Sequence, residues 1–241
     1  MIIDLEDAVP NDQKRQARET VAAWLSGERP VYVRVNGATT AWFRADVEAL
    51  ARPGLAGIIL PNAEDPAQIA EVVDGIPQEA RVIPLLETAV GIWNAREIAT
   101  GPRVEHLAFG AIDFQLDTGI DGDNEELLYA RSRLVLASRV AGTLAPLDGI
   151  TVALDDAERL RADVIRAQRL GFGGKLCIHP SQVEEVNRGF TLTEREVAWA
   201  RRVLEAAEAA TGAIRFEGEV IDRPRIERAK RIIGWVTTNE S

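Results

Sequence analysis

Acidic side chains stand directly after two apolar runs in the middle of this sequence. Glu87 follows the run from Arg81 to Leu86, and Asp113 comes just beyond the run from Val104 to Phe109. Two carboxylates that converge on one place repel each other unless a cation lies between them. Oxygen ligands with room for water and substrate suit Mg²⁺ best, with Mn²⁺ second. We therefore predict that Glu87 and Asp113 bind a metal. On position alone, a helix-capping Glu87 and a loop carboxylate at Asp113 are the alternative.

A second acidic group follows the first apolar residues of the chain. Asp4 and Glu6 project to the same side of an extended strand, because successive strand residues alternate in direction. Carboxylates beside a metal, here Glu6 and Asp7, orient the water molecules that the ion holds. For Asp7, a solvated turn that caps a helix explains the residue equally well.

One arginine lies at the end of a β-branched run. Arg34 stands between Val33 and Val35, so its side chain is expected to be partly buried and to need an anionic partner. That partner is either a carboxylate of the protein or a carboxylate or thioester oxygen of a substrate. We favour the substrate.

Four further residues carry weaker signals. Asp148 and His179 also close predicted strands, but a histidine before proline is often structural. Cys177 lies inside an apolar run and is expected to be inert core. Asp222, taken by itself, has the position of a helix N-cap, with Pro224 in the first turn.

Strands and helices that alternate along the chain must position these residues. Seven apolar or β-branched runs are separated by segments with helical spacing, and the runs cover residues 2–3, 31–35, 55–60, 81–86, 104–109, 144–150 and 174–178. Continuous apolar strands between helices favour a parallel sheet that is buried on both faces. We predict an α/β fold, a TIM-type (β/α) barrel, in which the strand ends gather at one face.

The strand count also divides the chain. A complete barrel of this type has eight strands, so the barrel is expected to lack its first βα unit, which would lie before Met1. Residues 1–190 are assigned to the (β/α)-barrel catalytic domain. Residues 191–241 are predicted to form a helical C-terminal extension that packs on the barrel or on a neighbouring subunit.

Composition excludes several classes of partner. The formal net charge is -10, from 38 acidic and 28 basic residues, and no Lys/Arg-rich run is present, so nucleic acid and anionic membrane are not expected as partners. No apolar run approaches the roughly 20 residues of a membrane span. The single cysteine and the absence of a signal-peptide pattern favour a cytoplasmic protein.

Seven segments, in this order, together resemble the citrate lyase β-subunit/malyl-CoA lyase family of the HpcH/HpaI aldolase superfamily. The resemblance covers essentially the whole chain. The segments are Ile3 to Val9, Val33 to Asn36, Ile59 to Pro61, Leu86 to Ala89, Phe109 to Phe114 with Asp117 and Gly119, Gly173 to Gln182, and Val220 to Pro224.

The resemblance implies a (β/α)-barrel with a divalent metal on Glu87 and Asp113, of which Glu87 also contacts the substrate. Arg34 would match the arginine that holds the substrate's carboxylate or carbonyl and stabilises developing negative charge, and Glu6 and Asp7 would match residues that support metal-bound water. The implied activity is a Mg²⁺-dependent carbon–carbon lyase that cleaves or condenses a short 3-hydroxyacyl-CoA, such as citryl-, malyl- or citramalyl-CoA. Its binding partners would be a small keto acid and an acyl-CoA.

The same resemblance makes Asp222 a catalytic acid/base residue, delivered by the C-terminal segment into a neighbouring subunit's site. That arrangement implies a homo-oligomer, a homotrimer or a hexamer. Two departures weaken CoA binding: the absent first βα unit, which in relatives carries an Arg-rich Pro-Gly segment, and Asn62 in place of the lysine of a Leu-Pro-Lys motif. The alternatives are a metal-dependent 2-keto-acid aldolase without CoA, or a non-catalytic assembly subunit with an incomplete site.

Overall fold

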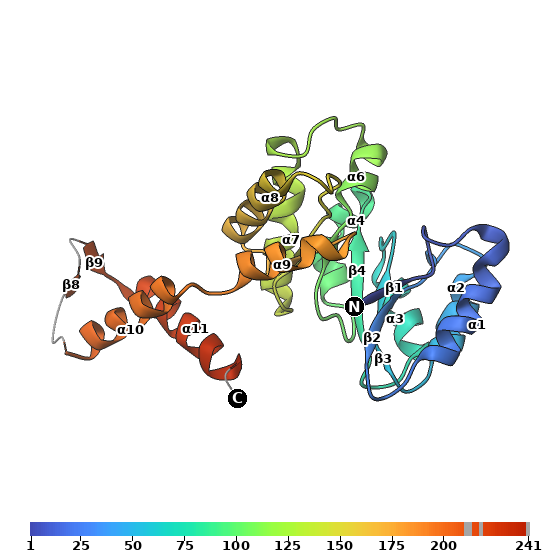
Figure 1. Cartoon of the computed structure of the whole chain (residues 1–241), viewed down its shortest axis with the longest axis horizontal. Coiled ribbons are helices and arrows are strands. Elements are labelled where there is room, and N and C mark those ends of the chain that lie inside the picture. The colour runs from blue at the N-terminus through green and yellow to red at the C-terminus, as the bar shows by residue number, and fades with distance from the viewer. Residues whose placement is uncertain (210–213, 217–218, 240–241) are drawn as a thin grey trace. The chain divides into compact units, whose positions relative to one another are not determined.

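A computed structural model describes residues 1–209, 214–216 and 219–239 of the chain. The chain forms two compact units, Met1–Gly189 and Phe190–Ser241 (Figure 1). No helix in the described part of the chain combines the length and apolar character needed to cross a membrane.

The first unit is built on a parallel seven-stranded sheet whose strand order follows the chain order. Each strand pairs in parallel with the next, so every connection returns along the outside of the sheet. The strands are β1 (Ile2–Asp4), β2 (Val31–Arg34), β3 (Leu55–Leu60), β4 (Arg81–Leu86), β5 (Ala108–Phe109), β6 (Leu147–Asp148) and β7 (Gly174–Lys175). The predicted parallel α/β architecture is confirmed as this curled sheet, a half-barrel of the TIM-barrel type.

Helices fill the connections between the strands (Figure 1). They are η1 (Asn11–Gln13), α1 (Lys14–Trp24), α2 (Phe43–Leu50), α3 (Pro66–Gly75), α4 (Ala89–Trp93), α5 (Ala95–Ala99), α6 (Ala111–Thr118), η2 (Glu125–Leu127), α7 (Leu128–Ala141), α8 (Ala157–Leu170) and α9 (Pro180–Phe190). Local chemistry sets their ends. Asp65 and Gln68 form a capping box at the start of α3, with a proline in its first turn, and Gly142 ends α7 in the left-handed conformation.

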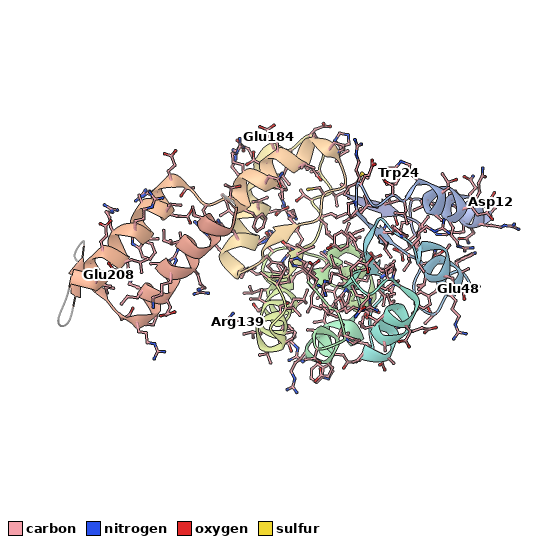
Figure 2. The ribbon with its side chains drawn as sticks, turned by 90° about the horizontal axis from the view of Figure 1, so that it is seen from below. Asp12, Trp24, Glu48, Arg139, Glu184 and Glu208 are labelled. Atoms are coloured by element: carbon pink, nitrogen blue, oxygen red, sulfur yellow. The ribbon has the colours of Figure 1, made fainter. Side chains whose placement is uncertain are left out.

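The central strands β3 and β4 are buried on both faces, as their continuous apolar sequences predict. On β3, Ile58 belongs to the layer between sheet and helices, whereas its neighbour Ile59 belongs to the layer inside the curve of the sheet. Val82 and Ile83 divide in the same way on β4. Charged side chains lie at the outer surface, as Figure 2 shows for Asp12, Glu48, Arg139 and Glu184.

Several local predictions differ from the structure. The strands expected over 104–109, 144–150 and 174–178 are shorter, and cover only Ala108–Phe109, Leu147–Asp148 and Gly174–Lys175. After Lys175, the backbone N–H of Leu176 still donates to the carbonyl oxygen of Asp148 at 2.9 Å, and residues 176–178 then line a cavity. No element was predicted directly after Phe109, but residues Ala111–Thr118 form helix α6. Only Ala111 and Phe114 are buried in that helix, so its sequence carries little helical periodicity.

The second unit pairs two helices with a short hairpin. Helix α10 (Glu194–Ala209) and helix α11 (Arg223–Asn239) enclose a small core, and strands β8 (Ile214–Phe216) and β9 (Glu219–Ile221) pair antiparallel. The core contains Ala200, Val203, Ile221, Ala229 and Ile232.

Candidate metal and substrate site

A cavity of about 520 Å³ opens at the carboxyl ends of the parallel strands. One side of it carries charged residues: Asp4 and Arg34 at the ends of β1 and β2, and Glu87 and Asp113 just beyond β4 and β5. Parallel strands deliver their carboxyl ends to one face, which explains how residues more than a hundred positions apart come together.

Glu87 is fixed rigidly at the floor of this site. Its side chain is 3% exposed, and Oε1 accepts a 2.7 Å hydrogen bond from the backbone N–H of Asn62. Asn62 has a φ of 50°, a left-handed conformation that asparagine tolerates better than most residues. Gly110 packs so closely that a Cβ placed there would lie 2.4 Å from Glu87 Oε2. The glycine is therefore required for the position of the carboxylate.

Asp113 lies in the first turn of α6 and is exposed to the cavity. A negative side chain is favoured there by the helix dipole. The pKa of Glu87 is raised to about 8, chiefly by burial; the charges of Glu6 and Asp113 act in the same direction, and the Asn62 hydrogen bond and the Arg34 charge oppose them. Three carboxylates thus share one electrostatic environment.

Glu6 belongs to the same group, although it does not line the cavity itself. Burial raises its pKa to about 7, and the charges of Asp7, Asp4 and Asp113 act in the same direction while Arg34 opposes them. For Asp4, burial is outweighed by the hydrogen bonds and charge of Arg34, so its pKa is lowered. A cation placed among Glu6, Glu87 and Asp113 would relieve the cost of ionising them.

Arg34 is held by the first strand and the turn after it. Its Nε donates to Asp4 Oδ1 at 2.8 Å and its Nη2 to Asp4 Oδ2 at 2.6 Å. Glu6 Oε2 lies 3.1 Å from Nη1, and Asp7 Oδ2 lies 3.3 Å from Nη2. Of the two kinds of partner considered for Arg34, the structure supplies protein carboxylates; the substrate contact stays a prediction.

The donors present fit a hard cation that keeps part of its water shell. Among the described residues, no three His, Cys, Asp or Glu side chains are arranged to hold a metal ion on their own. Glu87 and Asp113 offer two carboxylates, and Mg²⁺ is typically held by one or two carboxylates together with water and substrate oxygens. Two carboxylates of this kind would hold such an ion together with water and substrate oxygens, and the assignment of Glu87 and Asp113 as its ligands stays a prediction.

Three other predicted positions lie elsewhere. Asp222 belongs to the second unit, where its Oδ1 accepts the N–H of Arg225 at 3.2 Å and caps α11; its catalytic role stays a prediction. Asp148 is fully buried and pairs with Arg131 at 3.0 Å, within the helix layer. The exposed His179 contacts Ser181 Oγ at 2.7 Å, at the start of α9.

Sequence reasoning missed the part of the cavity that is formed at the β6–β7 edge of the sheet. It has no charged side chain and consists of Ile150, Leu176, Cys177 and Ile178. Cys177 was expected to be inert core, but it is only half-buried and lines the cavity. The apolar run that contains these residues indicated a strand, and nothing in its pattern distinguished a cavity wall from a paired strand.

Comparison with known proteins agrees with this geometry. The family profile described as HpcH/HpaI aldolase/citrate lyase matches residues 1–180. The citrate lyase subunit beta-like protein of Deinococcus radiodurans is 38% identical over 97% of this chain and 87% of its own length. A (3S)-malyl-CoA thioesterase of Cereibacter sphaeroides is 34% identical over 97% of this chain and 85% of its own.

A solved structure extends the likeness to three dimensions. The CitE protein of Mycobacterium tuberculosis, crystallised with magnesium, acetoacetate and coenzyme A, superposes with a TM-score of 0.84 at 34% identity. The match covers 97% of this chain and 88% of that one. This chain belongs to the HpcH/HpaI aldolase/citrate lyase family.

Proposed function

We propose that this protein is a Mg²⁺-dependent carbon–carbon lyase that cleaves or forms a short 3-hydroxyacyl-CoA by aldol or Claisen chemistry. The observation that carries the proposal is the meeting of Glu87 and Asp113 in one cavity, beside Glu6, where burial and mutual repulsion raise the pKa of Glu87 to about 8. The relative that was crystallised with magnesium, acetoacetate and coenzyme A supports the same ligand classes for this site.

In this proposal Glu87 and Asp113 hold the ion, and Mn²⁺ can replace Mg²⁺. When bound, the ion supplies Lewis-acid polarisation of a carbonyl oxygen. Glu87 contributes a carboxylate that Asn62 and Gly110 fix in place, so little reorganisation is needed on binding. Glu6 and Asp7 act as hydrogen-bond acceptors that orient water at the site.

Arg34 serves as the charge-stabilising group. In the cleavage direction, the 3-hydroxyl gives its proton to a water molecule of the site, and carbon 3 becomes the carbonyl carbon of the keto acid. The bond between carbons 2 and 3 breaks, and its electron pair moves onto the thioester as an enolate. A guanidinium held within the cavity stabilises that negative charge. The two hydrogen bonds from Asp4 fix the plane of the guanidinium, which prepares its orientation before substrate binds.

Asp222 is proposed as the acid/base residue that exchanges a proton with carbon 2 of the acyl group. It sits at the N-terminus of α11, exposed, so its carboxylate is accessible to a partner surface. We propose that it acts in the cavity of a neighbouring subunit of a homo-oligomer, a trimer or a hexamer. Acid/base help of this kind contributes about 10²–10⁴-fold to rate.

One relative, one residue of this chain and the possibility of a site without turnover define the competing candidates. The Cereibacter sphaeroides relative named as a (3S)-malyl-CoA thioesterase raises hydrolysis of the thioester as a second candidate. Asn62, which supplies a backbone N–H to Glu87 and no cationic side chain, favours an aldolase that does not use CoA. A non-catalytic assembly subunit would keep the fold without turnover.

Isothermal titration separates these candidates. Pyruvate, oxaloacetate and acetyl-CoA are titrated separately, each with Mg²⁺ and with EDTA. Mg²⁺-dependent binding of both a keto acid and acetyl-CoA is the expected result. Binding of keto acid alone would replace the proposal with a CoA-independent aldolase, and binding of neither would indicate an assembly subunit. Release of free CoA from malyl-CoA without a keto-acid product would identify a thioesterase.

A further inference from the structure

The cavity has two chemically different sides. The charged side, at the ends of β1, β2, β4 and β5, carries Asp4, Asp7, Arg34, Glu87 and Asp113 together with apolar residues such as Ile59 and Leu85. The loops after β6 and β7, at the other edge of the sheet, form a wall without charged side chains from Ile150, Leu176, Cys177 and Ile178. An apolar wall of this kind has no group that could hold an ion or a carboxylate. Its natural ligand is a hydrocarbon part of a molecule whose polar part lies on the charged side.

The apolar wall comes from two separate loops. Ile150 lies in the loop between β6 and α8, whereas Cys177 and Ile178 lie in the loop between β7 and α9. The backbone N–H of Leu176 still donates to the carbonyl oxygen of Asp148 in β6 at 2.9 Å, but Ile150, Cys177 and Ile178 lie outside the strands, so side-chain contacts help to fix their positions.

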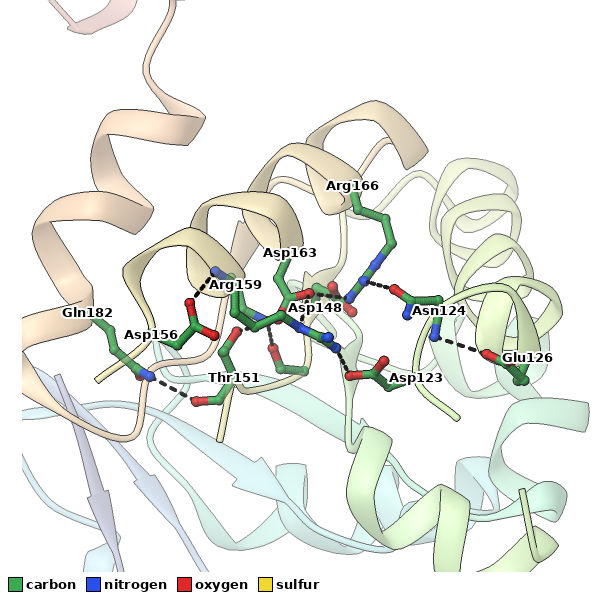
Figure 3. Close-up of polar contacts among 12 residues, drawn as sticks. Asp123, Asn124, Glu126, Asp148, Thr151, Asp156, Arg159, Asp163, Arg166 and Gln182 are labelled. Carbon is green, nitrogen blue, oxygen red and sulfur yellow. Dashed lines mark hydrogen bonds and ion pairs between the residues drawn. The ribbon is translucent and has the colours of Figure 1, made fainter. Parts of the chain in front are cut away.

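Gln182 joins these two loops. Its side chain is 2% exposed, and both ends of its amide group form hydrogen bonds, of which Figure 3 shows the one to Thr151. Nε2 donates to the carbonyl oxygen of Thr151 at 2.8 Å, and Oε1 accepts from the backbone N–H of Ile178 at 3.0 Å. Gln182 bonds Ile178 directly and also bonds Thr151, the residue after Ile150. This one buried amide therefore sets the separation of Ile150 and Ile178.

The bridge is anchored in α8. The hydroxyl of Thr151 donates to Asp163 Oδ2 at 2.8 Å, and Asp163 Oδ1 lies 3.2 Å from Arg159 Nε and 2.9 Å from Arg166 Nη2 (Figure 3). Lys175 donates from Nζ to the carbonyl oxygen of Gly149, which precedes Ile150. Buried polar groups that are connected in this way hold one arrangement because each broken bond leaves an unpaired group.

We propose that Gln182 is a positioning residue that fixes the apolar wall and thereby limits the acyl-CoA that is released on cleavage, or condensed in the reverse direction, to one with a short, unbranched and uncharged acyl chain. The inference rests on the proposed function, since it assigns the acyl half of that substrate to the wall. Gln182 does not touch Glu87, Asp113 or Arg34, so it acts on acyl-group selection and leaves the charged side unchanged.

The test compares a series of thioesters of increasing acyl length and uses Cys177, the only cysteine of the chain, as the probe of binding. Because Cys177 lies in the wall, a bound acyl group shields it from iodoacetamide, and the protection gives a dissociation constant without any turnover. Acetyl-, propionyl- and butyryl-CoA are compared on the full-length protein. One methylene too many in an apolar pocket costs about 10-fold or more, so butyryl-CoA is expected to bind at least about 10-fold more weakly than the best ligand.

The decisive variant is Gln182→Glu. A carboxylate keeps the acceptor for Ile178 but faces the Thr151 carbonyl without a proton to donate, so the two loops separate. In this variant we expect the ratio of the dissociation constants of butyryl-CoA and the best ligand to fall to about threefold or less, below the ratio of about 10 expected of an intact pocket. A ratio between ligands does not depend on the fraction of folded protein, so a merely destabilised variant would keep the wild-type ratio. Gln168→Glu, the same change at an exposed position of α8, is the matched control.

A second variant protects the test against misfolding. Ile150→Ala enlarges the cavity beside the wall and leaves the two hydrogen bonds of Gln182 in place. It should make butyryl-CoA bind more tightly relative to acetyl-CoA. The inference would be overturned if the relative dissociation constants of the three thioesters stayed at the wild-type values in both Gln182→Glu and Ile150→Ala. It would also be overturned if no thioester protected Cys177 of the wild-type protein from iodoacetamide. Mg²⁺ and oxaloacetate titrations are run on the same samples. Their failure would count against the proposed function alone, because they report on the charged side of the cavity.

Discussion

Asp4 and Arg34 occupy paired positions on the adjacent strands β1 and β2 and meet through two hydrogen bonds, of 2.8 and 2.6 Å. The first strand therefore does more than complete the sheet. It orients Arg34, which among the described residues is the only arginine that lines the charged side of the cavity. A planar guanidinium bound at two points keeps its orientation, and a lysine at this position would lose that geometry.

Asp4→Asn is expected to destabilise the fold and to loosen Arg34. A hydrogen bond to a charged group contributes about 1.5–3 kcal/mol, so the free energy of unfolding should fall by about that amount. Urea denaturation of both proteins measures the change. Asp7→Asn is the control, because Asp7 is 75% exposed and contacts Arg34 only at 3.3 Å; its effect should stay below about 1 kcal/mol. Equal effects of the two substitutions would show that the two-point contact adds nothing.

Glu87→Gln and Asp113→Asn should each abolish tight Mg²⁺ binding while the fold remains intact. Changing residues that only support a metal ligand costs about 10–100-fold in affinity, so loss of a ligand should exceed about 100-fold. Glutamine at position 87 still accepts the Asn62 hydrogen bond, which preserves the local structure. Titration calorimetry gives the affinity and circular dichroism the fold. Glu48→Gln, at an exposed position (Figure 2), should bind as the wild type does, and wild-type affinity in either site variant would remove that residue from the ligand set.

The stability of the metal-free protein should fall as pH rises through neutrality. The pKa of Glu87 is raised from 4.5 to about 8 in the folded state. Between these values the folded protein binds more protons than the unfolded chain, so the free energy of unfolding decreases with pH in that window. Glu6, raised to about 7, acts in the same direction, whereas Asp4 acts oppositely at lower pH because its pKa is lowered. Saturating Mg²⁺ should remove much of the decline, since the ion favours the ionised carboxylates. Glu87→Gln should flatten the slope, and thermal unfolding between pH 5 and about 8 measures both effects.

Gly110→Ala should weaken Mg²⁺ binding although it removes no ligand. A Cβ at this position would lie 2.4 Å from Glu87 Oε2, so the carboxylate must move. We expect a loss of affinity of about 10-fold or more, in the range seen when groups that support a ligand are altered. Gly27→Ala is the control, because nothing lies within 4 Å of its added methyl group. Normal affinity in Gly110→Ala would show that the carboxylate is free to adjust.

The ends of β3, β4 and β5 could be located from the sequence, but the direction of the side chains at strand ends could not. Glu87 follows β4 and Arg34 ends β2, and both line the cavity. Asp148 ends β6 in the same way, yet it points into the helix layer and pairs with Arg131. Because these strands are apolar on both faces, alternation does not say which face is the inner one.

Features that depend on packing between distant segments were also hidden. The contact of Gly110 with Glu87 and the bridge formed by Gln182 each join residues from different βα units. No sequence pattern around a single glycine or glutamine predicts such a partner. Both residues lie in segments that resemble the family, but the role of each follows only from the distances in the structure.

Asp222 provides the last test, because its proposed action in a neighbouring subunit has a consequence that no single chain can mimic. Asp222→Ala and Glu87→Ala should each be inactive alone. Co-expressed with two different affinity tags and purified through both, their mixed oligomers should regain turnover, since one cavity then combines Glu87 of one subunit with Asp222 of the next. Mixed oligomers of two differently tagged Asp222→Ala chains are the control and should stay inactive. An Asp222 that only caps α11 would lower the stability of the second unit, by about 1 kcal/mol as for other helix caps. That role predicts no recovery in demonstrably mixed oligomers, so the two roles are separated by one purification and one assay.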